Sequence, residues 1–291
     1  MVADATTLTR PVTGTAAGVP YLALPPAVSD APAPLVLALH AFDPPRGEAA
    51  LAGAIPMAPL PAWRVYLGLP LFGARLPKGG VPEVKRRGER DYLIELFGPV
   101  VEESAAELRR VVGALRAALA VTDDPVGLVG FGAGAAAVLL TLAENRLPVG
   151  AAAVINPVAD PALVIAARER RTGEPYAWDE RSRQTREWLD FTARAEEIAR
   201  ARTPVLVISG GQDEVVTPDD GQALHDALQP HVPEHALRHI VIPDLAHTIG
   251  PEPGLAPGPL TPAGVLTDRA LTEWLHRHLA ASTQVEPSPQ G

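Results

Sequence analysis

The stretch that decides the fold is VGLVGFGAGAAAVLL, residues 126–140. Its first six residues are apolar or glycine, as in a strand buried on both faces of a sheet. Glycines occupy every second position from Gly130 to Gly134 at the end of this strand, and an Ala/Leu segment of helical spacing comes next. This order predicts a buried strand that turns sharply into a buried helix. The uncharged run Val126–Ala143 has the length of a membrane span. Because glycines crowd its first half, we assign it to a protein core and expect no membrane segment.

Short apolar runs alternate with longer segments of helical periodicity along the rest of the chain. This alternation predicts the α/β class, with a mostly parallel central sheet flanked by helices. We expect strands near residues 21–24, 35–39, 65–69, 127–131, 151–155, 205–209 and 239–242, and helices near 100–120, 135–144 and 267–279.

The chain length and composition favour one large domain. The 291 residues are 47% hydrophobic, which is enough for one sizeable core, so we expect a single domain over residues 1–291. Residues 283–291 are expected to form a flexible tail.

The segment 160–202 breaks the alternation. It is rich in Arg and Glu, carries Trp178 and Trp188, and adds helical sequence between two core strands. Two interpretations stay open: a helical lid inserted over a binding site, or an ordinary surface crossover that contacts no ligand.

The composition excludes several classes of function. A net charge of −9 argues against nucleic-acid binding, which needs a basic face. The chain has no Cys, so it has no disulfide framework, thiolate zinc site or Cys nucleophile. No His/Glu motif with metal-ligand spacing occurs, and we expect neither metal nor cofactor. The first ten residues do not resemble a signal peptide, so we expect a cytoplasmic protein; the oligomeric state cannot be predicted.

The pentapeptide at residues 130–134, Gly-Phe-Gly-Ala-Gly, resembles the nucleophile elbow of the α/β-hydrolase family, whose pattern is G-x-S-x-G. In that family the outer glycines let strand and helix approach closely, and the central residue is the nucleophile. Here the central residue is Gly132, which has no hydroxyl group. The resemblance implies the α/β-hydrolase fold, in an esterase-like or dienelactone-hydrolase-like member with Gly at the nucleophile position. A dinucleotide fingerprint, G-x-G-x-x-G, does not fit, because its third glycine is missing at the required offset.

The resemblance extends to two later positions and one earlier loop. Asp213 follows the strand at 205–209, where the family has its triad acid, and His247 follows the strand at 239–242, where the family has its histidine. The sequence His40-Ala41-Phe42 follows the strand at 35–39 and resembles the oxyanion loop. The resemblance therefore implies an oxyanion hole made by the backbone N–H of Ala41 or Phe42 together with that of Ala133.

Each of these residues also has an ordinary structural explanation. Asp213 fits a turn after two glycines, His247 fits a surface loop, and His40 fits either a scaffold for the oxyanion loop or a catalytic group. For substrate binding we name His40, Phe72, Phe131, Trp178 and Trp188. The aromatic residues expected to line an apolar pocket are Phe42, Phe72, Phe131 and Tyr176.

Three hypotheses for the function follow, all with a small molecule as the partner. In the first, His247 polarised by Asp213 acts as an acid or base on a small hydrophobic carbonyl or ester compound, without an acyl-enzyme, in a cyclisation, elimination, isomerisation or hydration. In the second, the chain is a serine esterase, lactonase or thioesterase inactivated by a Ser-to-Gly change at position 132. In the third, it is a binding protein without catalytic activity.

Overall fold

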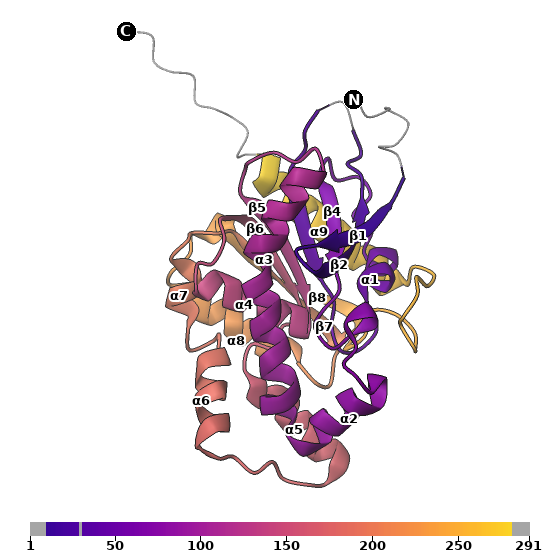
Figure 1. Ribbon diagram of the computed structural model, residues 1–291. Helices are drawn as coiled ribbons and strands as arrows, with labels where there is room; N and C mark the ends of the chain where they lie inside the picture. The colour runs from indigo at the N-terminus through magenta and orange to yellow at the C-terminus, as the bar shows by residue number, and fades with distance from the viewer. Residues whose placement is uncertain (1–9, 29–30, 281–291) are drawn as a thin grey trace.

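The computed structural model describes residues 10–28 and 31–280 (Figure 1). Within these ranges eight strands form one sheet in the order β1-β2-β4-β3-β5-β6-β7-β8. β2 is antiparallel to both β1 and β4, and every other pair is parallel. The strands are β1 (Val12–Ala16), β2 (Val19–Leu24), β3 (Leu35–Leu39), β4 (Trp63–Leu67), β5 (Val126–Phe131), β6 (Val149–Ile155), β7 (Val205–Gln212) and β8 (Leu237–Ala246). The predicted α/β class with a mostly parallel sheet is confirmed, while the expected tail at 283–291 lies outside the described residues.

Helices cover both faces of the sheet (Figure 1). Apolar residues of α3, α4 and α8 form the core on one face, and those of α1 and α9 form the core on the other. The helices are α1 (Glu48–Ala54), α2 (Gly80–Arg90), α3 (Gly98–Ala118), α4 (Ala133–Ala143), α5 (Pro161–Thr172), α6 (Glu180–Leu189), α7 (Ala195–Ala199), α8 (Pro218–Leu228) and α9 (Pro262–Ala280), with shorter turns η2 (Gly73–Arg75), η3 (Leu93–Phe97) and η4 (Glu234–Ala236). Figure 1 shows α2, α5 and α6 gathered at one end of the molecule, beyond the sheet.

The stretch that decides the fold lies at the centre of this arrangement. β5 is flanked by β3 and β6, α4 follows it after one residue, and every residue of 126–143 is buried. The apolar run is therefore a core strand followed by a core helix. Across the described ranges, no helix combines the length and the apolar character that crossing a membrane requires.

Two glycines allow β5, α4 and the end of β3 to pack backbone against backbone. A Cβ at Gly130 would lie 2.5 Å from the Cα of Ala135, and a Cβ at Gly134 would lie 2.4 Å from the carbonyl oxygen of Leu39. These distances are shorter than any van der Waals contact, and the atoms in the way belong to the backbone, so no side-chain rotation relieves them. The outer glycines of the pentapeptide are thus required by packing.

Replacing one of these glycines tests the close approach. Gly134→Ala should lower the free energy of unfolding by about 3 kcal/mol, because α4 must move away from β3 to make room for the methyl group. Gly113→Ala, in the exposed part of α3 where a Cβ meets nothing within 4 Å, is the matched control. It should raise the free energy of unfolding by about 0.5–1 kcal/mol through helix propensity. Urea denaturation measures both, and equal effects of the two variants would contradict the packing argument.

Candidate active site

Gly132 is the single residue between β5 and α4, and it has an unusual backbone conformation. Its φ of 54° and ψ of −112° lie in a region that residues with a side chain rarely adopt. Its N–H donates a hydrogen bond to the carbonyl oxygen of Ile155 at 3.0 Å, which holds the turn against β6. A Cβ at this position would lie 3.0 Å from the Cβ of Ala41. The turn therefore points its central residue at the loop that follows β3.

Asp213 and His247 come from the ends of two adjacent parallel strands, β7 and β8. His247 Nδ1 lies 2.9 Å from Asp213 Oδ2. The other carboxylate oxygen of Asp213 accepts hydrogen bonds from the backbone N–H groups of Val215 and Val216, at 2.7 and 2.9 Å. Because Asp213 is only 4% exposed, these contacts hold its carboxylate in a single orientation. The carboxylate in turn fixes the orientation of the imidazole ring.

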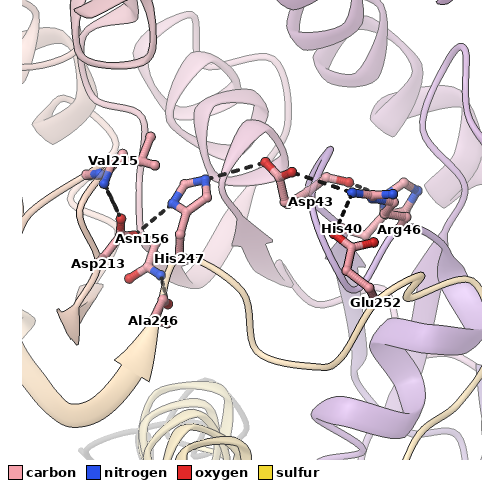
Figure 2. Close-up of polar contacts among 11 residues, drawn as sticks. His40, Asp43, Arg46, Asn156, Asp213, Val215, Ala246, His247 and Glu252 are labelled. Atoms are coloured by element: carbon pink, nitrogen blue, oxygen red, sulfur yellow. Dashed lines mark hydrogen bonds and ion pairs between the residues drawn. The ribbon is translucent and has the colours of Figure 1, made fainter. Parts of the chain in front are cut away.

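A residue that the sequence analysis did not consider, Asn156, joins the strand ends that carry this pair (Figure 2). It follows β6, is fully buried and has a φ of 43°. Its side-chain amide donates to the carbonyl oxygen of Ala246 at 2.8 Å, and its side-chain oxygen accepts from the N–H of Gly210 at 2.7 Å. One side chain thereby links the ends of β6, β7 and β8 directly behind His247. The only sequence signal was an Asn directly after a buried strand.

A second carboxylate, Asp43, faces the other side of the imidazole ring (Figure 2). Its Oδ2 lies 3.6 Å from His247 Nε2, an ion-pair distance longer than a hydrogen bond. Asp43 is also 3.7 Å from Arg46, which in turn pairs with Glu252 at 3.0 Å. The sequence analysis missed Asp43, although it follows directly after His40-Ala41-Phe42. The imidazole is thus held between two carboxylates.

These contacts favour the charged forms of His247 and Asp43. Burial of the His247 ring opposes protonation, but the carboxylates of Asp213 and Asp43 outweigh it and raise the pKa of His247 to about 9. The contact with His247 lowers the pKa of Asp43 against the effect of burial, and Arg46 and Arg171 lower it further. At neutral pH the ring is therefore an imidazolium ion that carries a proton on Nε2, on the side of Asp43.

His40 has a different environment. It is fully buried, and burial lowers its pKa to about 4 despite its bond to Ala41, so the ring is neutral at pH 7. Its Nε2 accepts a hydrogen bond from the N–H of Leu69 at 3.1 Å, which leaves Nδ1 to donate to the carbonyl oxygen of Ala41 at 2.7 Å. His40 ties the oxyanion-like loop to the end of β4 and does not line the cavity described next.

A cavity of about 560 Å³ opens at this edge of the sheet. It brings together Gly132, His247, Ala41, Phe42, Ala133 and Phe72 from the sequence-based set, together with Asp43. Ala133 is the first residue of α4, so its N–H has no acceptor inside the helix. The remaining lining residues are Tyr92, Leu96, Phe97, Val158, Val164, Ala167, Arg168, Arg170, Arg171, Glu214, Val215 and Thr248.

Besides His40, four residues expected near a substrate lie away from this cavity: Phe131, Tyr176, Trp178 and Trp188. Phe131 is buried in the core under α1 and α9. Trp188 donates a hydrogen bond from Nε1 to Glu144 at 3.0 Å, and Trp178 packs edge-on against Tyr176 beside Arg186. The contribution of the segment 160–202 to the cavity comes from α5, whose residues between Val164 and Arg171 line one wall.

The sheet, the turn at Gly132 and the order of positions 132, 213 and 247 define an α/β-hydrolase fold. A sequence model of the Serine hydrolase (FSH1) family matches residues 85–250, more than half of the chain. The chain therefore belongs to this family. No curated protein sequence gives a match.

Solved structures share the fold at low sequence identity. TT1662 from Thermus thermophilus superimposes with a TM-score of 0.69 at 24% identity, over 93% of this chain and 98% of that one. Est1E from Butyrivibrio proteoclasticus, solved with ferulic acid bound, gives 0.57 at 15% identity, over 92% and 99%. The Pyrococcus horikoshii acylaminoacyl peptidase gives 0.61 at 15% identity, over 96% of this chain and 42% of that longer chain. At these identities the likeness concerns the fold alone.

The raised pKa of His247 predicts how stability depends on pH. The folded protein binds a proton on this ring up to about pH 9, whereas the unfolded chain releases it near pH 6.5. The stabilisation from His247, up to about 3 kcal/mol, is therefore complete below pH 6.5 and is lost as the pH rises through 9. Urea unfolding of wild type and His247→Gln should show a stability difference that shrinks from pH 6.5 to pH 9.5. A difference that stays constant or grows over this range would contradict the assignment.

Proposed function

We propose that this chain catalyses a proton transfer on a small, mostly apolar carbonyl compound without forming an acyl-enzyme. The observation that carries the proposal is the His247 ring held between the carboxylates of Asp213 and Asp43, beside a turn residue without a side chain. An ionised carboxylate and an ionised imidazole 3.6 Å apart make a base and an acid available in one cavity. Isomerisation, elimination, hydration and cyclisation next to a carbonyl group all use such a pair.

The proposed reaction begins with Asp43 as the base. Its carboxylate removes a proton from the carbon next to the substrate carbonyl, and the electrons of the broken C–H bond form an enolate. The enolate oxygen accepts hydrogen bonds from the backbone N–H of Ala133 and from that of Ala41 or Phe42. His247 then gives its Nε2 proton to another carbon in an isomerisation, or to a departing hydroxyl group in an elimination.

One further proton transfer returns Asp43 and His247 to their starting protonation states. After the reaction Asp43 is protonated and His247 is neutral, and passage of the proton from Asp43 to Nε2 restores the starting state. Asp213 holds the ring in place throughout. A positioned acid or base contributes about 10²–10⁴ in rate, and one oxyanion donor contributes about 10²–10³. Both contributions to the rate are available without a covalent intermediate.

Deuterium exchange tests the proposal without knowledge of the natural substrate. A panel of small aromatic and aliphatic ketones, esters and lactones is incubated with the protein in D₂O, and loss of the α-proton signal is followed by NMR. We expect exchange with at least one class of compound, and a decrease of about 10²–10⁴ in His247→Gln and in Asp43→Asn.

The control for this experiment is His231→Gln, which changes an exposed histidine and should leave the exchange rate unchanged. Thermal unfolding confirms that each variant is folded. Exchange no faster than in buffer across the panel, or equal exchange by wild type and His247→Gln, would overturn the proposed function.

A second candidate function is that of a serine hydrolase that has lost its nucleophile. Membership of the serine hydrolase family and the backbone angles at Gly132 favour it. In this case the site is the remainder of a Ser-His-Asp triad in which position 132 no longer supplies a hydroxyl group. Asp43 then lies on the side of the ring that a serine hydroxyl would face.

The variant Gly132→Ser tests this second candidate. The new Cβ requires Ala41 to move by a few tenths of an ångström, and a side chain at a φ of 54° adds backbone strain. Because Asp213 and Asp43 together raise the pKa of His247 to about 9, we expect weak cleavage of 4-nitrophenyl acetate at pH 7 that rises as the pH approaches 9. The double variant Gly132→Ser/Asp43→Ala should cleave at least tenfold faster at pH 7, since a neutral imidazole is the base that a serine needs.

Wild type should not react with a fluorophosphonate probe, whereas both serine variants should be labelled at residue 132. Folded serine variants with neither labelling nor ester cleavage would exclude position 132 as a nucleophile site.

A further inference from the structure

The cavity carries more positive charge than the rest of the molecule would suggest. The chain has a net charge of −9. Helix α5 nevertheless places Arg168, Arg170 and Arg171 on the cavity wall, where the only carboxylates among the described lining residues are Asp43 and Glu214. With the His247 imidazolium, the cavity has an excess of positive charge in an acidic protein. Such a contrast attracts an anionic ligand.

None of these three arginines pairs with a carboxylate within the described part of the chain. Arg170 donates a hydrogen bond to the backbone carbonyl of Glu214 at 3.1 Å. Arg168 and Arg171 form no ion pair with a described residue, although several arginines of neighbouring elements do. Arg168 and Arg171, here called the arginine pair, are three residues apart on one helix and so lie on the same face of it. Two guanidinium groups are thus available to one ligand group.

The charges of the arginine pair affect two other titratable groups on the cavity wall, Tyr92 and Asp43. Tyr92 is half-buried on this wall, and desolvation together with Asp43 raises its pKa, while Arg171 and Arg168 oppose that rise. Arg171 also contributes to the lowered pKa of Asp43. The positive charges of the arginine pair therefore contribute to the electrostatic potential inside the cavity.

The cavity that holds the arginine pair and His247 also has an apolar wall. Phe42 stacks on Phe72 with ring centroids 4.9 Å apart and meets Phe97 edge-on at 6.1 Å. Leu96, Val158 and Val164 complete this part of the wall. A matching ligand has a reactive carbonyl at one end, an apolar or aromatic body in the middle, and a group at the other end that the guanidinium groups bind.

We propose that the arginine pair is a subsite for an anionic group, so that the substrate is an apolar carbonyl compound that also carries a carboxylate or a phosphate. Arginine suits both groups, because its planar fork donates two parallel hydrogen bonds to a pair of anionic oxygens. The position of the carbonyl beside His247 rests on the proposed function. The anion subsite itself rests only on α5 and the cavity.

Binding measurements separate the two proposals, because they require no turnover. The probes are 4-oxo-4-phenylbutanoate and its longer homologues up to the heptanoate, each with the neutral amide as its partner and a phosphonate of the same length. Isothermal titration calorimetry at low salt should show at least one acid or phosphonate that binds at least tenfold more tightly than its amide. Its affinity should fall as the ionic strength rises.

The variant Arg168→Gln/Arg171→Gln should weaken binding of that anion at least tenfold and leave binding of the amide unchanged. The control is Arg109→Gln/Arg110→Gln on the exposed face of α3, which removes the same charge from the protein away from the cavity. It should change anion binding less than twofold. Tighter binding of the carboxylate than of the phosphonate assigns a carboxylate to the subsite, and the reverse assigns a phosphate.

The subsite is overturned if no anion binds better than its amide, if the α5 variant loses both ligands equally, or if the α3 control loses as much affinity as the α5 variant. Selective anion binding without α-proton exchange of the bound compound would refute the proposed function and leave the subsite standing.

Discussion

The contact between a buried carboxylate and an imidazole ring is the constraint on which the rest of this site depends. Two backbone N–H groups bind one carboxylate oxygen of Asp213 and so fix the orientation of the carboxylate. The imidazole ring of His247 must therefore lie where the other carboxylate oxygen can accept its hydrogen bond. This requires the ends of β7 and β8 to lie very close together. Gly210 makes that possible, since a Cβ there would lie 2.4 Å from the carbonyl oxygen of Leu245. The glycines before Asp213 therefore serve the site through the packing of the backbone.

Once the ring is fixed on one side, its other side decides the chemistry. In a serine hydrolase, Nε2 faces a hydroxyl group and takes its proton. Here Nε2 faces Asp43, and Gly132 presents only backbone. Asp43 favours an imidazolium ion, which gives a proton more readily than it takes one. The same fold that presents a serine and a base elsewhere thereby presents, in our proposal, an acid and a carboxylate base.

Much of the fold followed from local patterns in the sequence. The buried strands and the turn at residues 130–134 carry strong signals, because a two-sided buried strand is apolar along its length and a close backbone approach admits only glycine. β1 was not predicted, since its sequence VTGTA is short, mostly exposed and stabilised by pairing with β2. The helices of 160–202 were expected only as a group, because their charged surfaces hide the apolar spacing.

The site was predictable where position along the chain determines position in space. Residues at the ends of neighbouring parallel strands meet at one edge, and the resemblance to the α/β-hydrolase family pointed to Gly132, Asp213 and His247 among them. Asp43 and Asn156 were missed, because a carboxylate in a loop and an Asn after a strand are common and only the three-dimensional contacts distinguish them. Phe131, Trp178 and Trp188 were named for their chemistry, but the face of a strand or helix on which an aromatic residue lies decides what it lines.

The most direct test of this account is the protonation state of one ring. A ¹⁵N NMR titration of histidine-labelled protein, with the His247 signal assigned by its absence in His247→Gln, measures it. The account predicts that His247 carries protons on both nitrogens at pH 7.5 and titrates near pH 9, and that Asp43→Asn moves this transition to lower pH. A ring that is neutral at pH 7.5 and titrates at or below pH 6.5 would contradict it.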